Sequence, residues 1–190
     1  MVTTKSESRP LTARQQKGRA VNAVAEMLER RLAVPKIYLE PPSSIISADV
    51  LAVDRAGAGD LHAVEVKCYR QLGKEPSSTE HDTETALRRV RETTRSWLRH
   101  LIAMPAHYKY LAIPRLSWRF LNTMLVPMLL SADGIGKIGI IEIVERGQEP
   151  STAEILILPE RFRVDAAKLT KIEKTLINNK KVRPDIEVRI

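Results

Sequence analysis

Two short apolar segments separated by a glycine-rich turn constrain the fold of this chain more than any other feature. Residues 47–54 alternate between two faces, with Asp49 and Leu51 on the same one, which is the period of a β-strand. Residues 56–60 read Ala-Gly-Ala-Gly-Asp, a composition typical of hairpin turns, and residues 61–67 supply an apolar return strand. The sequence therefore predicts an antiparallel β-hairpin.

The segments around this hairpin predict alternating helices and strands. Apolar residues at three- and four-residue spacing predict helices over 14–33, 82–104 and 116–130. Shorter apolar runs predict strands over 36–40, 108–113 and 138–144, followed by a strand over 154–158 and a basic helix over 165–178. The order helix, three strands, helix, strand, helix, strand predicts an α/β fold, a mixed sheet with helices on both sides and a C-terminal strand and helix added to it.

A chain of 190 residues is long enough for one well-buried core and short for two domains of typical size. We therefore expect a single domain. Residues 1–13 are expected to form a flexible N-terminal tail, residues 14–146 the core, and residues 147–190 a basic C-terminal extension of the same domain.

The charge of the chain points to a polyanionic partner. The 31 Lys and Arg residues against 23 Asp and Glu give a net charge of +8 and a pI near 9.8, a balance that favours nucleic acid. Aromatic residues make up only 4%, too few for a base-stacking platform. We therefore expect any nucleic-acid contacts to be mainly to phosphates.

The sequence also indicates where the protein works. Its single cysteine, Cys68, excludes an internal disulfide framework and fits a reducing compartment. The longest apolar run, residues 120–130, is too short to span a bilayer, and the charged N-terminus does not resemble a secretory signal. We expect a cytoplasmic protein with no membrane segment.

Three charged residues of the predicted hairpin form the candidate site. Glu65 and Lys67 are two residues apart, so their side chains leave the same face of the return strand, and the hairpin brings Asp49 within reach. Two carboxylates beside one ammonium would be costly in an apolar hairpin unless something offset them, and a hard divalent cation with oxygen ligands does so. Mg²⁺ is the expected ion, with the backbone carbonyl of Val66 as a third protein ligand; the plainer alternative is a solvent-facing strand with an ordinary Glu/Lys pair.

These residues resemble a known motif. The runs Ala48-Asp49-Val50-Leu51-Ala52-Val53 and Ala63-Val64-Glu65-Val66-Lys67 look like the core of the PD-(D/E)xK nuclease superfamily, which has the restriction-endonuclease-like fold, and the order of elements over residues 14–144 is similar to that fold. The resemblance implies that Asp49 and Glu65 bind Mg²⁺ or Mn²⁺ and that Lys67 assists the attacking water. Junction-resolving members are among those it resembles. Ala48 stands where the motif has Pro.

The resemblance also raises the question of an accessory acid on the first helix. Related enzymes often supply a glutamate from that helix, and Glu26 and Glu29 are the two candidates in this sequence. The alternative for both residues is a solvated acidic face of the helix.

Four arginines on the long predicted helix are candidates for nucleic-acid binding. They recur at spacings of three, four and four and form one stripe beside the apolar face, which suits contacts to phosphates. Because pairs of opposite charge four residues apart also occur there, a salt-bridged surface helix is the alternative. The four are Arg88, Arg91, Arg95 and Arg99.

These observations lead to one functional expectation and two alternatives. The expectation is a metal-dependent DNA endonuclease that hydrolyses phosphodiester bonds, for which cutting of two strands would favour a homodimer. The first alternative is a catalytically inactive protein of the nuclease fold that acts as a DNA-binding or assembly module. The second is an accessory subunit whose basic surface meets a protein partner.

Overall fold

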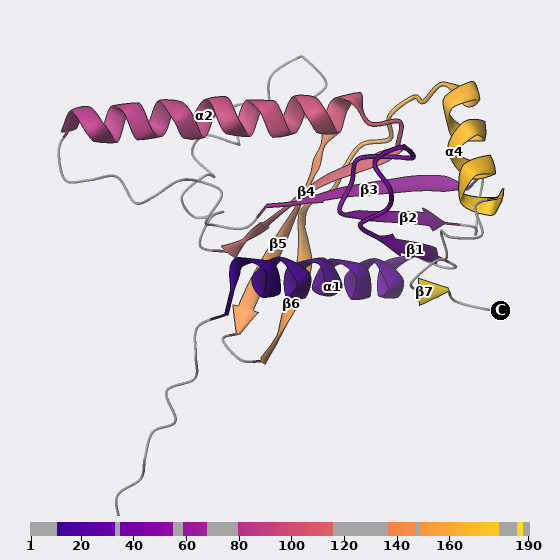
Figure 1. Cartoon of the computed structure of the whole chain (residues 1–190), viewed down its shortest axis with the longest axis horizontal. Helices are drawn as coiled ribbons and strands as arrows, with labels where there is room; N and C mark the ends of the chain where they lie inside the picture. Colours follow the sequence, from indigo (N-terminus) through magenta and orange to yellow (C-terminus); the bar gives the residue numbers. More distant parts are fainter. Residues whose placement is uncertain are drawn as a thin grey trace, which may run out of the picture.

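The protein has a mixed α/β fold built on one curled sheet (Figure 1). The structure is a computed structural model and describes residues 11–32, 35–54, 59–67, 80–115, 137–146, 149–178 and 186–187. In these residues the sheet has seven strands in the order β6-β5-β4-β3-β2-β1-β7. No helix among the described residues is long and apolar enough to cross a membrane.

The strands divide into an antiparallel group and a parallel group. β1 (Pro35–Leu39), β2 (Val50–Asp54) and β3 (Asp60–Val66) pair antiparallel in chain order. β3 then pairs parallel with β4 (Tyr108–Pro114), which pairs parallel with β5 (Gly139–Arg146). β6 (Glu149–Ile157) returns antiparallel along β5, and β7 (Ile186–Glu187) adds to the outer side of β1.

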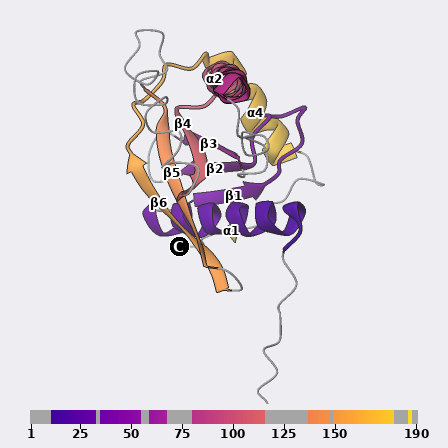
Figure 2. The same cartoon turned by 90° about the vertical axis from the view of Figure 1, so that its left-hand side faces the viewer.

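Two helices cover opposite faces of this sheet, as Figure 2 shows. α1 (Ala13–Arg31) begins with a capping box, in which Thr12 and Gln15 satisfy each other's backbone N–H groups. α2 (Glu80–Ala103) lies over the other face, and α4 (Ala166–Asn178) packs near one end of the sheet. Each face of the sheet has its own apolar core, one including Val21 and Val24 of α1, the other Leu98 and Leu101 of α2.

The predicted α/β class is confirmed, and several boundaries are corrected. Asp49 was expected inside a strand, but it lies one residue before β2. β6 begins at Glu149 rather than at residue 154, because it forms a long hairpin with β5. β7 was not predicted, since two residues carry no periodic pattern. The predicted helix over 116–130 and residues 1–10 of the predicted tail over 1–13 lie outside the described residues, whereas Thr12 caps α1 and Ala13 begins it.

Candidate functional site

Asp49 is held in place by backbone groups of both neighbouring strands. Its N–H donates to the Val64 carbonyl at 2.9 Å, and its own carbonyl accepts from the Glu40 N–H at 2.7 Å. Its side chain is buried, and Oδ2 accepts a hydrogen bond of 2.7 Å from the Val66 N–H. The carboxylate therefore bridges from the start of β2 to the end of β3.

Glu65 and Lys67 form an ion pair at this same end of β3. The Lys67 Nζ donates to Glu65 Oε1, and both side chains are mostly buried. The Lys67 backbone N–H donates to the Ala112 carbonyl at 2.9 Å, which ties the residue to β4. Its ammonium lies 5.4 Å from the centre of the Trp97 ring of α2. Asp49 is therefore bonded to Val66, the residue between Glu65 and Lys67, while Glu65 and Lys67 contact each other.

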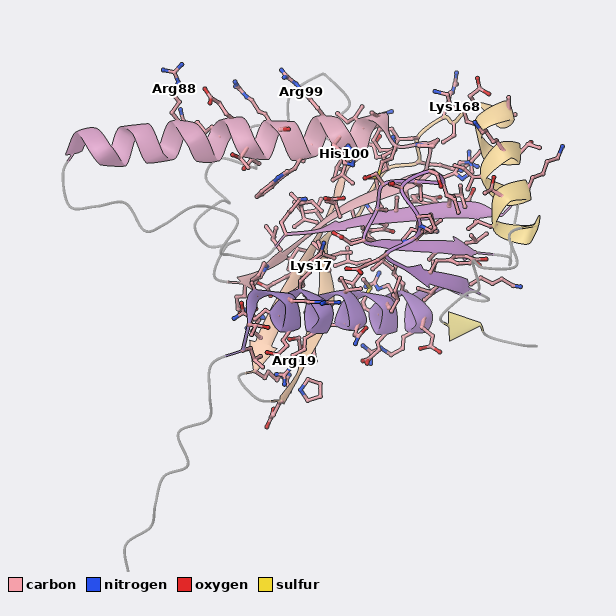
Figure 3. The ribbon with its side chains drawn as sticks, in the orientation of Figure 1. Lys17, Arg19, Arg88, Arg99, His100 and Lys168 are labelled. Atoms are coloured by element: carbon pink, nitrogen blue, oxygen red, sulfur yellow. The ribbon has the colours of Figure 1, made fainter. Side chains whose placement is uncertain are left out.

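A lysine from α1 completes the cluster, and the sequence reasoning missed it. The Lys17 Nζ lies 2.6 Å from Asp49 Oδ1, and Figure 3 shows its side chain pointing from α1 toward the sheet. The spacing of Lys17 in the helix is the sequence signal that could have predicted this contact. Lys17 precedes Val21 by four residues, and Val21, Val24 and Leu28 line the buried stripe of the helix, so Lys17 continues that stripe with a charge.

The expected accessory acids are not brought to Asp49. Glu26 and Glu29 follow Lys17 by nine and twelve residues in the same helix. At a rise of 1.5 Å per residue they lie roughly 14 and 18 Å further along the helix axis, and Glu26 is about half a turn away from Lys17 around it. Glu26 is exposed and Glu29 partly exposed, so α1 presents a lysine where an acid was expected.

The backbone at Glu40 is in an uncommon conformation beside this cluster. Its φ is +44°, in the left-handed region that residues other than glycine rarely adopt, and it precedes Pro41, which normally favours an extended residue before it. The carbonyl of Asp49 holds this conformation through the Glu40 N–H. Residues in such strained conformations occur preferentially at functional sites.

The charges of the cluster act together on Lys17. Its partial burial by itself lowers its pKa, but the hydrogen bond and charge of Asp49 raise it, as do the charges of Glu40 and Glu65, and the net pKa lies above the usual value. The ammonium of Lys17 is therefore surrounded by negative charge from three carboxylates. Two ammonium groups, those of Lys17 and Lys67, thus balance the two carboxylates of Asp49 and Glu65.

The donor types at this edge suit a hard divalent cation, but their number is small. Asp49 and Glu65 offer oxygen ligands, and the Val66 carbonyl stays a predicted third ligand. Within the described residues, no group of three or more His, Cys, Asp or Glu side chains is placed to hold a metal ion. A cation here would need backbone or water oxygens and would have to compete with the two lysines.

A second buried carboxylate lies on β5, two strands along the sheet from β3. Glu142 of β5 is 7% exposed, and its Oε2 accepts from Arg115 Nη2 at 2.7 Å and from Arg115 Nε at 3.0 Å. The two residues are 27 positions apart, so no local sequence pattern predicts this pair. Glu154 of β6 lies opposite Glu142 in the register, so Arg115 also offsets two facing carboxylates.

The arginines of α2 lie on the surface, away from the candidate site. Arg88, Arg91, Arg95 and Arg99 are all exposed. Figure 3 shows Arg88 and Arg99 pointing outward from the helix, whereas Trp97 faces Lys67. Arg88 also pairs with Glu92 at 3.1 Å, as the salt-bridge alternative predicted. The stripe and the carboxylates are therefore on different sides of α2.

Buried histidines occupy the other end of β3. His62 stacks on Tyr108, with ring centres 4.6 Å apart, and its Nδ1 lies 3.3 Å from the Tyr110 hydroxyl. Burial lowers the pKa of His62 to about 4, while the charges of nearby acids oppose this shift. Nearby, Arg161 donates to Asp60 at 2.8 Å and holds the pKa of that carboxyl below its usual range. This end of the sheet therefore contributes to stability.

Comparison with known proteins adds no assignment. No protein-family model matches the chain, and no curated protein matches it. A solved structure of a protein of unknown function from Silicibacter pomeroyi is similar over 92% of this chain and 88% of that one, with a TM-score of 0.44 and 12% sequence identity. Because the TM-score is low and that protein's function is unknown, the similarity assigns neither a fold family nor a function.

Proposed function

We propose that this protein is a metal-dependent DNA endonuclease with a restriction-endonuclease-like core, in which Asp49 and Glu65 hold Mg²⁺ or Mn²⁺. The observation that carries the proposal is the hydrogen bond from the Val66 N–H to Asp49 Oδ2. It fixes the Asp49 carboxylate at the end of the strand that carries Glu65, one residue before Lys67. The mixed sheet, with an antiparallel hairpin followed by a helix and a parallel strand, supports the proposed core.

The residues of the site have separate roles in this proposal. A divalent cation, when bound, would polarise a phosphoryl oxygen and lower the pKa of a bound water. Asp49 and Glu65 supply the negative charge that binds the cation. Lys67, held beside Glu65 and Trp97, orients the attacking water or stabilises charge that develops on the phosphoryl group. A cytoplasmic location, which the single cysteine favours, is part of the same proposal.

The surface arginines would bind the DNA backbone. Arg91 and Arg95 are exposed on α2, and none of the described residues forms a salt bridge with them. Because the stripe lies on the far side of α2 from Asp49, DNA held by it would have to pass around the helix to reach the site. We therefore assign the arginines to affinity and not to catalysis.

A second candidate is a catalytically inactive protein of the same fold that binds DNA or assembles with a partner. The pairing of Asp49 with Lys17 and of Glu65 with Lys67 favours it, because each carboxylate already has an internal counter-ion. The absence of a third protein side-chain ligand within the described residues supports the same candidate.

A cleavage assay separates the two candidates. Linear, nicked and branched DNA would be incubated with the wild type in Mg²⁺ or Mn²⁺, alongside Asp49→Asn and Lys67→Ala. Asp49→Asn keeps an oxygen that can accept from the Val66 N–H, so it removes the charge with little change in the fold. Each substitution is expected to lower the cleavage rate about 100-fold or more.

Lys168→Ala is the matched control, since Lys168 is exposed on α4 and points away from the site (Figure 3). It should cut at the wild-type rate. A wild type that binds DNA but cuts none of these substrates would favour the inactive candidate. Cleavage that survives both site substitutions would place the activity elsewhere in the chain.

A further inference from the structure

Both oxygens of the Asp49 carboxylate already have partners. Oδ2 accepts from the Val66 N–H at 2.7 Å, and Oδ1 lies 2.6 Å from the Lys17 Nζ. The first partner is a backbone group of β3 and cannot leave without breaking the strand end. The second is the end of a flexible side chain that is 35% exposed. Oδ1 is therefore the oxygen whose partner can be displaced, and a cation that binds there takes the position of the Lys17 ammonium.

The Lys17 ammonium lies in a position where the nearby charged groups are mainly carboxylates. Its ammonium contacts Asp49 and lies within the electrostatic influence of Glu40 and Glu65, which come from two other segments of the chain. Two like charges cannot share one carboxylate oxygen at close range without strong repulsion. Lys17 and a divalent cation at Asp49 are therefore alternatives.

We propose that Lys17 is the resident counter-ion of Asp49 and competes with the divalent cation for Oδ1, so that metal binds only when the Lys17 ammonium moves away. This inference rests on the proposed metal site and adds its regulation. The lysine keeps the buried carboxylate neutralised when metal is scarce, which avoids the cost of an unpaired buried charge. It also weakens the affinity of the site for metal.

Removing the charge of Lys17 should therefore strengthen metal binding. Lys17→Gln and Lys17→Met both abolish the ammonium, and both residues have a helix propensity close to that of lysine. Each is expected to bind Mn²⁺ about tenfold more tightly than the wild type, or better, because a positive charge next to the ion is gone. Lys17→Arg keeps the charge and should bind Mn²⁺ with the wild-type affinity.

The experiment is calorimetric titration of the full-length protein with MnCl₂, with Lys168→Gln as a control that removes one charge far from the site. Thermal unfolding with EDTA and with Mn²⁺ gives a second readout. The neutral Lys17 variants should show a larger metal-dependent rise in melting temperature than the wild type. The two neutral variants differ in polarity. If one of them fails to fold, the Mn²⁺ affinity can still be measured with the other.

Three results would overturn the inference. The first is an equal Mn²⁺ affinity for the wild type and the neutral variants, the second is a weaker affinity for the variants, and the third is no binding by any of them. The cleavage assay judges the proposed function separately. A wild type that cuts DNA with Mn²⁺ while Lys17→Gln binds the ion no more tightly refutes the counter-ion role and leaves the nuclease proposal standing.

Discussion

Acidification should destabilise this protein through one buried histidine. His62 is 6% exposed, and burial lowers its pKa from 6.5 to about 4. The unfolded chain therefore takes up a proton at a higher pH than the folded one. The contribution of His62 to the free energy of unfolding is therefore fully present above pH 6.5 and is lost as the pH falls toward 4. Between those values the lost free energy of unfolding reaches about 3 kcal/mol, and about 2 kcal/mol is gone by pH 5.

Urea unfolding measured at several pH values between 7.5 and 4 tests this effect. His62→Gln removes the titrating imidazole. Between pH 7.5 and 4, the free energy of unfolding of this variant should therefore fall by about 3 kcal/mol less than that of the wild type. The loss of the contact with Tyr108 lowers the stability of the variant at every pH and does not change that comparison.

Tyr110→Phe is the matched control. It deletes the hydroxyl that lies 3.3 Å from His62 Nδ1 but keeps the imidazole. Its pH dependence should follow the wild type. If His62→Gln loses as much stability as the wild type between pH 7 and pH 4, the imidazole does not carry the effect and the assignment is wrong.

Two further predictions concern the DNA surface and the packing of β5. Replacing Arg91 and Arg95 together by Gln should weaken DNA binding and reduce the slope of the logarithm of the DNA-binding constant against log salt by roughly 2. The control is the double variant Arg30→Gln/Arg31→Gln, on the helix that covers the other face of the sheet, which should leave that slope unchanged. Equal slopes for the wild type and both double variants would refute the proposed DNA-binding surface. A Cβ at Gly139 would lie 2.8 Å from Tyr110 Cδ1 and 2.9 Å from the Ile157 carbonyl oxygen, so Gly139→Ala should cost about 2 kcal/mol in urea unfolding. Gly18→Ala, where a Cβ meets nothing within 4 Å, should instead stabilise α1 by up to about 1 kcal/mol, and a loss at both sites would contradict the packing argument.

Local pattern was sufficient for much of the architecture. The apolar spacing of residues 14–33 predicted α1, and the alternation in residues 47–67 predicted the β2–β3 hairpin. These predictions succeeded because burial of one face imposes a period of 3.6 or 2 on the sequence itself. For the same reason, the two-residue spacing of Glu65 and Lys67 was enough to place their side chains together.

Such local patterns do not predict contacts between segments that are far apart in the sequence. Lys17 and Asp49 are 32 positions apart and meet only because α1 packs beneath the sheet at that end. The acids Glu26 and Glu29 were therefore predicted as the helix residues of the site, whereas the structure places Lys17 there. β7 was missed for a related reason, since its pairing with β1 depends on where the end of the chain returns.

The sequence by itself predicted the longer elements, the hairpin and the candidate residues Asp49, Glu65 and Lys67, because each prediction follows from spacing within a short segment. Only the tertiary structure decided which charges neutralise them. Electrostatic pairing depends on distance in space, and the fold brings the ammonium of Lys17 to a carboxylate that is buried and held by a backbone N–H. Because of that contact, the two carboxylates of the candidate site are already balanced by two lysines, with which a metal ion bound there would have to compete.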